Sequence, residues 1–137
     1  MKQVLTRLYW GNFDDVLDLD ELKKVGITHI VNCTFELDYD YSKEELETLK
    51  LNLVDGESIP INTLEKAIEF IIVGIARGKV FVHCNAGFSR SATIVLAYLI
   101  KIGFNRQSAM DLLPGAMPSI AAEDSLNRYF GILYTKD

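Results

Sequence analysis

Short apolar runs alternate along the chain with stretches whose apolar residues recur at helical spacing. Strands are expected over residues 8–10, 27–33, 49–54 and 80–82. Helices are expected over residues 18–25, 64–75, 91–102 and 121–134. Alternation of this kind predicts an α/β fold, a single domain with a central, mostly parallel sheet flanked by helices.

Glycine and polar residues mark the ends of several predicted helices. Gly26 is expected to stop the first helix and Gly78 to cap the one before residues 80–82. Ser42, with Glu45 three residues later, predicts a capping box for a further short helix. Asn105 is expected to cap another helix that ends before residue 114.

Composition narrows the class of protein. The 137 residues are 49% hydrophobic and 24% charged, so one domain over residues 1–137 is expected. The longest apolar run, 68–76, is too short to span a bilayer, and no apolar signal segment follows Met1, so we expect a cytoplasmic location. A net charge of −5 argues against nucleic acid or an anionic membrane as the main partner.

The residues that carry chemistry lie where the strand at 80–82 meets the next helix, in His-Cys-Asn-Ala-Gly-Phe-Ser-Arg-Ser at 83–91. A strand-to-helix turn leaves backbone N–H groups free, and the helix dipole adds positive potential there. Gly87 permits a tight turn, and Arg90 can bind two phosphate oxygens with its planar guanidinium. Cys84 in such a site is favoured as a thiolate, a nucleophile for phosphorus. The segment therefore predicts a phosphate-binding loop with a catalytic cysteine.

The segment resembles the His-Cys-x5-Arg signature loop of the protein tyrosine phosphatase superfamily, and its Ser-Arg-Ser ending is similar to the dual-specificity branch. Residues 8–12, 26–32 and 97–99 also match that family's pattern. The resemblance implies a protein phosphatase that hydrolyses phosphotyrosine, and phosphoserine or phosphothreonine as well, through a phosphocysteine intermediate. It implies no cofactor, and the two cysteines lie too far apart in sequence to form a zinc site unaided.

The resemblance also implies a role for each residue of this loop. Cys84 would be the nucleophile and Arg90 the phosphate clamp. Ser91 would stabilise the leaving thiolate, and His83 would orient the loop. The phosphate would be bound by the backbone of Asn85, Ala86, Gly87, Phe88, Ser89 and Arg90.

The reaction needs an acid to protonate the leaving oxygen. The family places an aspartate about thirty residues before the cysteine, in the loop after the third strand, and Asp55 occupies the matching position. Glu57 is the rival acid. Gly56 would let this loop move over bound substrate.

Two features bear on substrate and packing. Lysines that would meet the extra phosphates of a phosphoinositide are absent from residues 85–89, and the acidic stretch over 36–47 would repel polyanions if it borders the site. A phosphorylated protein is therefore the favoured substrate. The alternatives are a non-catalytic phosphoprotein-binding module, an RNA 5′-triphosphatase and a phosphoinositide phosphatase.

The sequence departs from the family pattern before the last helix. The family's Arg-Pro is replaced there by Leu113-Pro114 or Met117-Pro118, which bears on local packing.

Cys33 has two interpretations. It is either a small buried residue at a strand end or a redox partner of Cys84. In this fold, the strand that ends at Cys33 is expected to lie beside the strand that leads to Cys84. Neighbouring parallel strands lie about 4.8 Å apart, so a disulfide between the two cysteines would need only modest movement of the loop. Cys33 is also placed similarly to the partner cysteine in phosphatases of regenerating liver and the tensin-like lipid phosphatase, which implies reversible oxidation.

Overall fold

Five strands form one sheet in a computed structural model that describes the backbone of residues 1–134 and the side chains of residues 1–131. The order across the sheet is β1-β2-β5-β3-β4. β1 pairs antiparallel with β2, and the other neighbours are parallel, which confirms the predicted fold class. The strands are β1 (Lys2–Leu5), β2 (Leu8–Gly11), β3 (His29–Asn32), β4 (Glu47–Lys50) and β5 (Val80–His83).

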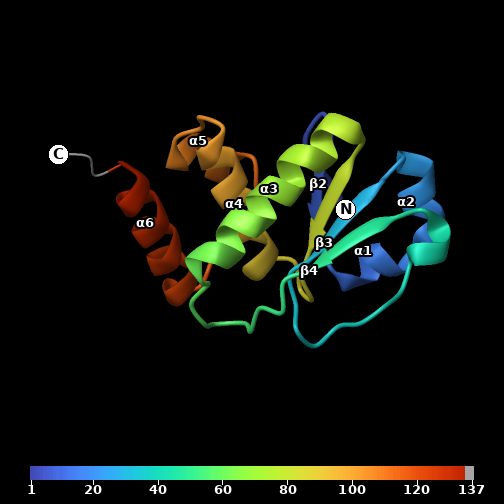
Figure 1. Cartoon of the computed structure of the whole chain (residues 1–137), viewed down its shortest axis with the longest axis horizontal. Helices are drawn as coiled ribbons and strands as arrows, with labels where there is room; N and C mark the ends of the chain where they lie inside the picture. The colour runs from blue at the N-terminus through green and yellow to red at the C-terminus, as the bar shows by residue number, and fades with distance from the viewer. Residues whose placement is uncertain (135–137) are drawn as a thin grey trace.

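Helices cover both faces of the sheet. Figure 1 shows α1 and α2 on one side of the strands and α3 to α6 on the other. The bounds are α1 (Phe13–Leu17), α2 (Leu19–Val25), the one-turn 3-10 helix η1 (Ser42–Glu44), α3 (Ile61–Arg77), α4 (Arg90–Lys101), α5 (Arg106–Asp111) and α6 (Ile120–Tyr134). No helix within residues 1–134 is long and apolar enough to cross a membrane.

The core explains why β5 is apolar at successive positions. Val80 and Val82 pack in the larger cluster with α3 and α4, while Phe81 points to the other face and packs with Val16 and Leu22. Strands covered on both faces lose the alternation of apolar and polar residues. In α4, the ten residues from Arg90 to Leu99 are buried, because the helix lies between the sheet, α3, α5 and α6. The start of α4, where the predicted loop joins it, is therefore fixed by its surroundings.

The predicted long elements are confirmed, whereas some short ones are wrong. The capping box at Ser42 and Glu45 does not form: η1 has no side-chain cap, and the Ser42 N–H donates instead to Asp40. A capping box occurs at α1, where Asn12 and Asp15 exchange hydrogen bonds. The strand expected over 49–54 covers Glu47–Lys50, because it ends level with its parallel partner β3.

The predicted helix ends hold at three positions. Gly26 ends α2 in the left-handed conformation with φ 92°, and Asn105 caps α5 by accepting a hydrogen bond from the Ser108 N–H. Gly78 caps α3 with an extended backbone.

Candidate active site

The predicted phosphate loop connects β5 to α4 at the end of the sheet where the parallel strands terminate. Gly87 has φ +87°, and a Cβ there would lie 3.1 Å from the Gly11 carbonyl oxygen, so only glycine fits. Its N–H donates to Cys84 Sγ at 3.3 Å. The loop thus turns at least one backbone donor toward the sulfur, as a nucleophile or bound anion requires.

Cys84 is buried, with 3% of its surface exposed, and its sulfur has a second polar neighbour. Ser91 Oγ lies 3.1 Å from Cys84 Sγ, and Trp10 Nε1 donates to the same Oγ at 3.0 Å. Because the indole N–H can only donate, the Ser91 hydroxyl accepts from Trp10 and has its own proton free for the sulfur. Trp10 was expected only as part of the first strand.

Arg90 lies at the other end of the loop, with its guanidinium fixed by two segments distant in sequence. Nη1 and Nη2 donate to the two carboxylate oxygens of Glu36 at 2.8 and 2.7 Å, and Nη1 also donates to the Leu53 carbonyl at 2.9 Å. The hydrogen bonds to Glu36 are the main cause that raises the pKa of Arg90, to which the charges of Cys84 and Asp55 add. In the sequence, Glu36 stands out only as one residue of an acidic stretch.

His83 is fully buried beneath the loop and hydrogen-bonded on both ring nitrogens. Nδ1 lies 3.1 Å from the Cys84 carbonyl, and Nε2 lies 2.7 Å from the Tyr39 hydroxyl. A carbonyl can only accept, which assigns the proton to Nδ1 and makes Tyr39 the donor to Nε2. Burial lowers the pKa of His83 to about 4, so the ring is neutral at physiological pH. This arrangement suits a residue that orients the loop.

The two candidate acids lie on the turn between β4 and α3, where both are exposed. The turn is closed by the Glu57 N–H, which donates to the Val54 carbonyl at 3.1 Å. Asp55 is close enough to Arg90 for its charge to raise the pKa of that guanidinium. The Leu53 carbonyl that binds Arg90 lies two residues before Asp55, so this turn borders the loop.

Cys33 follows β3, which pairs with β5 so that Asn32 is opposite His83. The Cys33 N–H donates to the His83 carbonyl at 2.9 Å, and both cysteines are free thiols. Burial, and then the negative charge of Cys84, raise the pKa of Cys33 well above its ordinary value. The structure therefore places the two cysteines at neighbouring strand ends.

The segment that lacks the family's arginine binds the loop through its backbone. The Met117 N–H donates to the Phe88 carbonyl at 2.6 Å, and the Ser119 N–H donates to Ser89 Oγ at 3.2 Å. On the opposite flank, the Phe13 N–H donates to the Asn85 carbonyl at 3.0 Å. Backbone contacts thus hold both sides of the loop.

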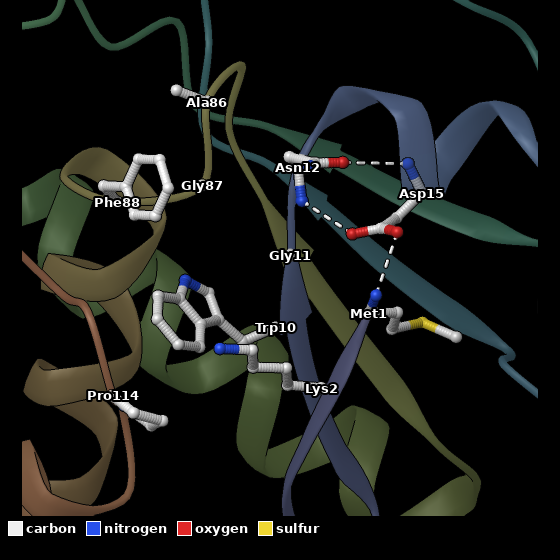
Figure 2. Close-up of a pocket in the computed structure, with 10 residues that line it drawn as sticks. All are labelled: Met1, Lys2, Trp10, Gly11, Asn12, Asp15, Ala86, Gly87, Phe88 and Pro114. Carbon is white, nitrogen blue, oxygen red and sulfur yellow. Dashed lines mark hydrogen bonds and ion pairs between the residues drawn. The ribbon is translucent and has the colours of Figure 1, made fainter.

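A cavity of about 250 Å³ lies beside the loop, between it and the first two strands (Figure 2). Lys2 Nζ lies 5.9 Å from the centre of the Trp10 ring, and the Asp15 carboxylate accepts hydrogen bonds from Asn12 and the Met1 ammonium. The residues that line the cavity are Met1, Lys2, Trp10, Gly11, Asn12, Asp15, Ala86, Gly87, Phe88 and Pro114. Cys84 and Arg90 are outside this lining, so the cavity flanks the predicted cradle. Among the described residues, no three His, Cys, Asp or Glu side chains cluster as metal ligands would.

The sequence over residues 8–130 matches the family described as "Dual specificity phosphatase, catalytic domain". The chain belongs to this family. That match confirms the resemblance stated from the sequence, and it covers the loop, both cysteines and both candidate acids.

Individual dual-specificity phosphatases show the same relationship. Dual specificity protein phosphatase 22 of Xenopus laevis is 33% identical over 122 residues, which cover 85% of this chain and 56% of that protein. Dual specificity protein phosphatase 15 of Mus musculus is 32% identical over 121 residues, which cover 86% of this chain and 51% of that protein. The chain therefore spans about half the length of these curated relatives.

Solved structures agree with the fold. A crystal structure of DUSP15 superposes with a TM-score of 0.84 at 31% identity, covering 94% of this chain and 86% of that one. A crystal structure of human DUSP28 superposes with a TM-score of 0.89 over the whole of both chains, and at 22% identity this likeness concerns the fold alone.

Proposed function

We propose that the chain is a protein phosphatase that hydrolyses phosphotyrosine, and phosphoserine or phosphothreonine as well, through a phosphocysteine intermediate. The observation that carries the proposal is the convergence of the Gly87 N–H and the Ser91 hydroxyl on the Cys84 sulfur. Two donors at one buried sulfur stabilise the thiolate that must attack phosphorus and later leave it. Membership of the dual-specificity family supports this chemistry.

In the first step, the Cys84 thiolate attacks phosphorus while the bond to the leaving oxygen breaks. Arg90 and the loop N–H groups bind the phosphoryl oxygens, and Asp55 gives its proton to the leaving oxygen. In the second step, water attacks phosphorus, Asp55 takes the proton of that water, and the S–P bond breaks to return the thiolate. Ser91 then donates its hydrogen bond to the sulfur.

The test is turnover of a small aryl phosphate by wild type and by Cys84→Ser. We expect the variant to bind inorganic phosphate with near wild-type affinity, because the loop and Arg90 remain, while turnover falls below about a hundredth of wild type. Residual activity above that level would show that Cys84 is not the nucleophile. Phosphate binding without turnover by wild type would instead favour the phosphoprotein-binding module.

Two finer properties belong to the same proposal. A cytoplasmic location suits a catalytic cysteine that must stay reduced, and Cys33 and Cys84 are both free thiols. Redox sensitivity is supported by the position of Cys33 at the strand end next to Cys84. Peroxide would oxidise the Cys84 thiolate to a sulfenic acid, and the Cys33 thiol would condense with it to a disulfide with loss of water.

A further inference from the structure

The carboxylate of Glu36 lies directly against the guanidinium of Arg90, although the two residues are 54 positions apart. The Arg90 side chain is 8% exposed and that of Glu36 is 31% exposed, so the pair lies at the boundary between protein and solvent. Two opposite interpretations are possible. Glu36 either occupies the place of a substrate phosphate or holds the arginine ready for one.

The number of guanidinium N–H groups left free by Glu36 and Leu53 distinguishes these interpretations. A guanidinium has five N–H groups in one plane. Nη1 uses both of its hydrogens, one on Glu36 and one on the Leu53 carbonyl, and Nη2 uses one on Glu36. The Nε–H and the second Nη2–H are left. These two lie parallel on one edge, which is the fork that binds two oxygens of a phosphate.

Glu36 therefore occupies the Nη1/Nη2 edge and leaves the Nε/Nη2 edge for an anion. The Leu53 carbonyl fixes the guanidinium from a third direction. Such a side chain has already lost its rotamer freedom before substrate arrives, so binding does not have to order it. A long arginine without these contacts would sample orientations that cannot bind phosphate.

We propose that Glu36 is a positioning residue that holds Arg90 with its Nε/Nη2 edge toward the phosphate of the substrate. The expected effect of Glu36 on catalysis rests on the proposed function. Its expected effect on phosphate binding rests only on the geometry of the guanidinium. The hydrogen bonds from Arg90 are the main cause that lowers the pKa of Glu36 to about 2, so Glu36 is anionic at neutral pH.

The test measures binding of inorganic phosphate by calorimetry, alongside kcat and KM for an aryl phosphate, in Glu36→Gln and Glu36→Ala. We expect phosphate affinity to fall about tenfold in Glu36→Ala and less in Glu36→Gln, with kcat/KM falling by about ten- to a hundredfold. Glu44→Gln is the control, because Glu44 also pairs with a cation, Lys23, and that pair lies outside the loop. That control should keep wild-type values.

A double-mutant cycle separates positioning from general packing. If Glu36 acts through Arg90, Glu36→Ala should have no further effect on phosphate affinity once Arg90→Ala is present. An additive loss would overturn the proposal, and so would unchanged phosphate affinity in the single variant. Tighter binding in Glu36→Ala would show that the carboxylate competes with phosphate. If Glu36→Ala does not fold, Glu36→Gln carries the comparison.

Because phosphate binding is measured without turnover, the outcomes for Glu36 and for the proposed function are distinguishable. Loss of phosphate affinity in a chain that never turns over substrate would support the role of Glu36 and contradict the phosphatase activity. Full activity with unchanged phosphate affinity in both Glu36 variants would support the phosphatase activity and contradict the role of Glu36.

Discussion

At the scale of single residues, the site depends on hydrogen-bond direction. Trp10 donates to Ser91, which leaves the serine proton for the Cys84 sulfur, and the Cys84 carbonyl fixes the tautomer of His83. Each assignment follows from a partner that can only donate or only accept. The Ser91 hydroxyl and the Gly87 N–H are therefore both available as donors to the Cys84 sulfur.

Asp55 is expected to be the general acid. Asp55→Asn should slow hydrolysis of alkyl phosphates by about 10²–10⁴, because a poor leaving group needs the proton. Activated aryl phosphates should be affected less. The measurement is kcat for both substrate classes in Asp55→Asn and Glu57→Gln, and a larger loss in Glu57→Gln would reverse the assignment.

At the scale of elements, the β5–loop–α4 unit was predictable from sequence, whereas its supports were not. Cys84, Gly87 and Arg90 lie within one segment of seven residues, and their chemistry follows from one strand-to-helix turn. Glu36 and Tyr39 reach that loop from the connection between β3 and β4, whose path depends on tertiary packing rather than on periodicity. The same connection contains the capping box that was wrong, because the Ser42 N–H there donates to the Asp40 side chain.

The pairing of β3 with β5 predicts reversible oxidation. Peroxide should inactivate wild type, and dithiothreitol should restore it, because a Cys33–Cys84 disulfide protects the catalytic sulfur from further oxidation. Burial keeps Cys33 protonated, so Cys84 should be oxidised first. Peptide mass spectrometry should detect the linked pair.

Cys33→Ser is the control for this prediction. It should be as active as wild type before treatment and should not recover afterwards. Full recovery of the variant would mean that Cys33 serves only in packing.

Burial of His83 at the end of β5 predicts a pH dependence of stability. Its pKa is 6.5 when unperturbed and about 4 in the fold, so between these values the unfolded chain binds more protons than the native protein. The free energy of unfolding should therefore rise with pH from 4 to 6.5 and fall as the pH is lowered through that window. One pKa unit corresponds to about 1.4 kcal/mol, so this group accounts for a change on the order of 3 kcal/mol.

Urea unfolding at a series of pH values would measure this contribution. His83→Asn retains a donor near the Cys84 carbonyl but cannot be protonated, so its stability should vary less over the same window. Equal slopes for the two proteins would contradict the contribution of His83.

At the scale of the whole molecule, charge and the rim of the site favour phosphorylated proteins over inositol lipids. The net charge is −5, and residues 85–89 contain no lysine. Three apolar side chains in or near this region are exposed: Phe88 in the loop (53%), Met117, whose N–H binds the Phe88 carbonyl (73%), and Phe35, the residue before Glu36 (53%). Apolar side chains of this kind suit peptide residues on either side of a phosphorylated one.

We therefore expect kcat/KM to be higher for the best phosphopeptide than for any soluble phosphoinositide in a matched panel. Ala86→Lys, at an exposed loop position, should raise activity toward phosphoinositides relative to wild type, since it adds the missing cation. A phosphoinositide that exceeds the best phosphopeptide with the wild-type enzyme would contradict the substrate class.

The segment over residues 33–41 forms hydrogen bonds with both ends of the predicted phosphate loop. Tyr39 binds His83 before the loop, and Glu36 binds Arg90 at its end. Hydrogen bonds from Asn32 and Lys50 to its carbonyls join it to the sheet. The coupling free energy between two sites is reciprocal. If the contacts of this segment strengthen anion binding at the loop, a bound anion must therefore stabilise the segment by the same free energy. Local opening of residues 33–41 is therefore expected to weaken anion binding, and a bound anion is expected to make such opening rarer.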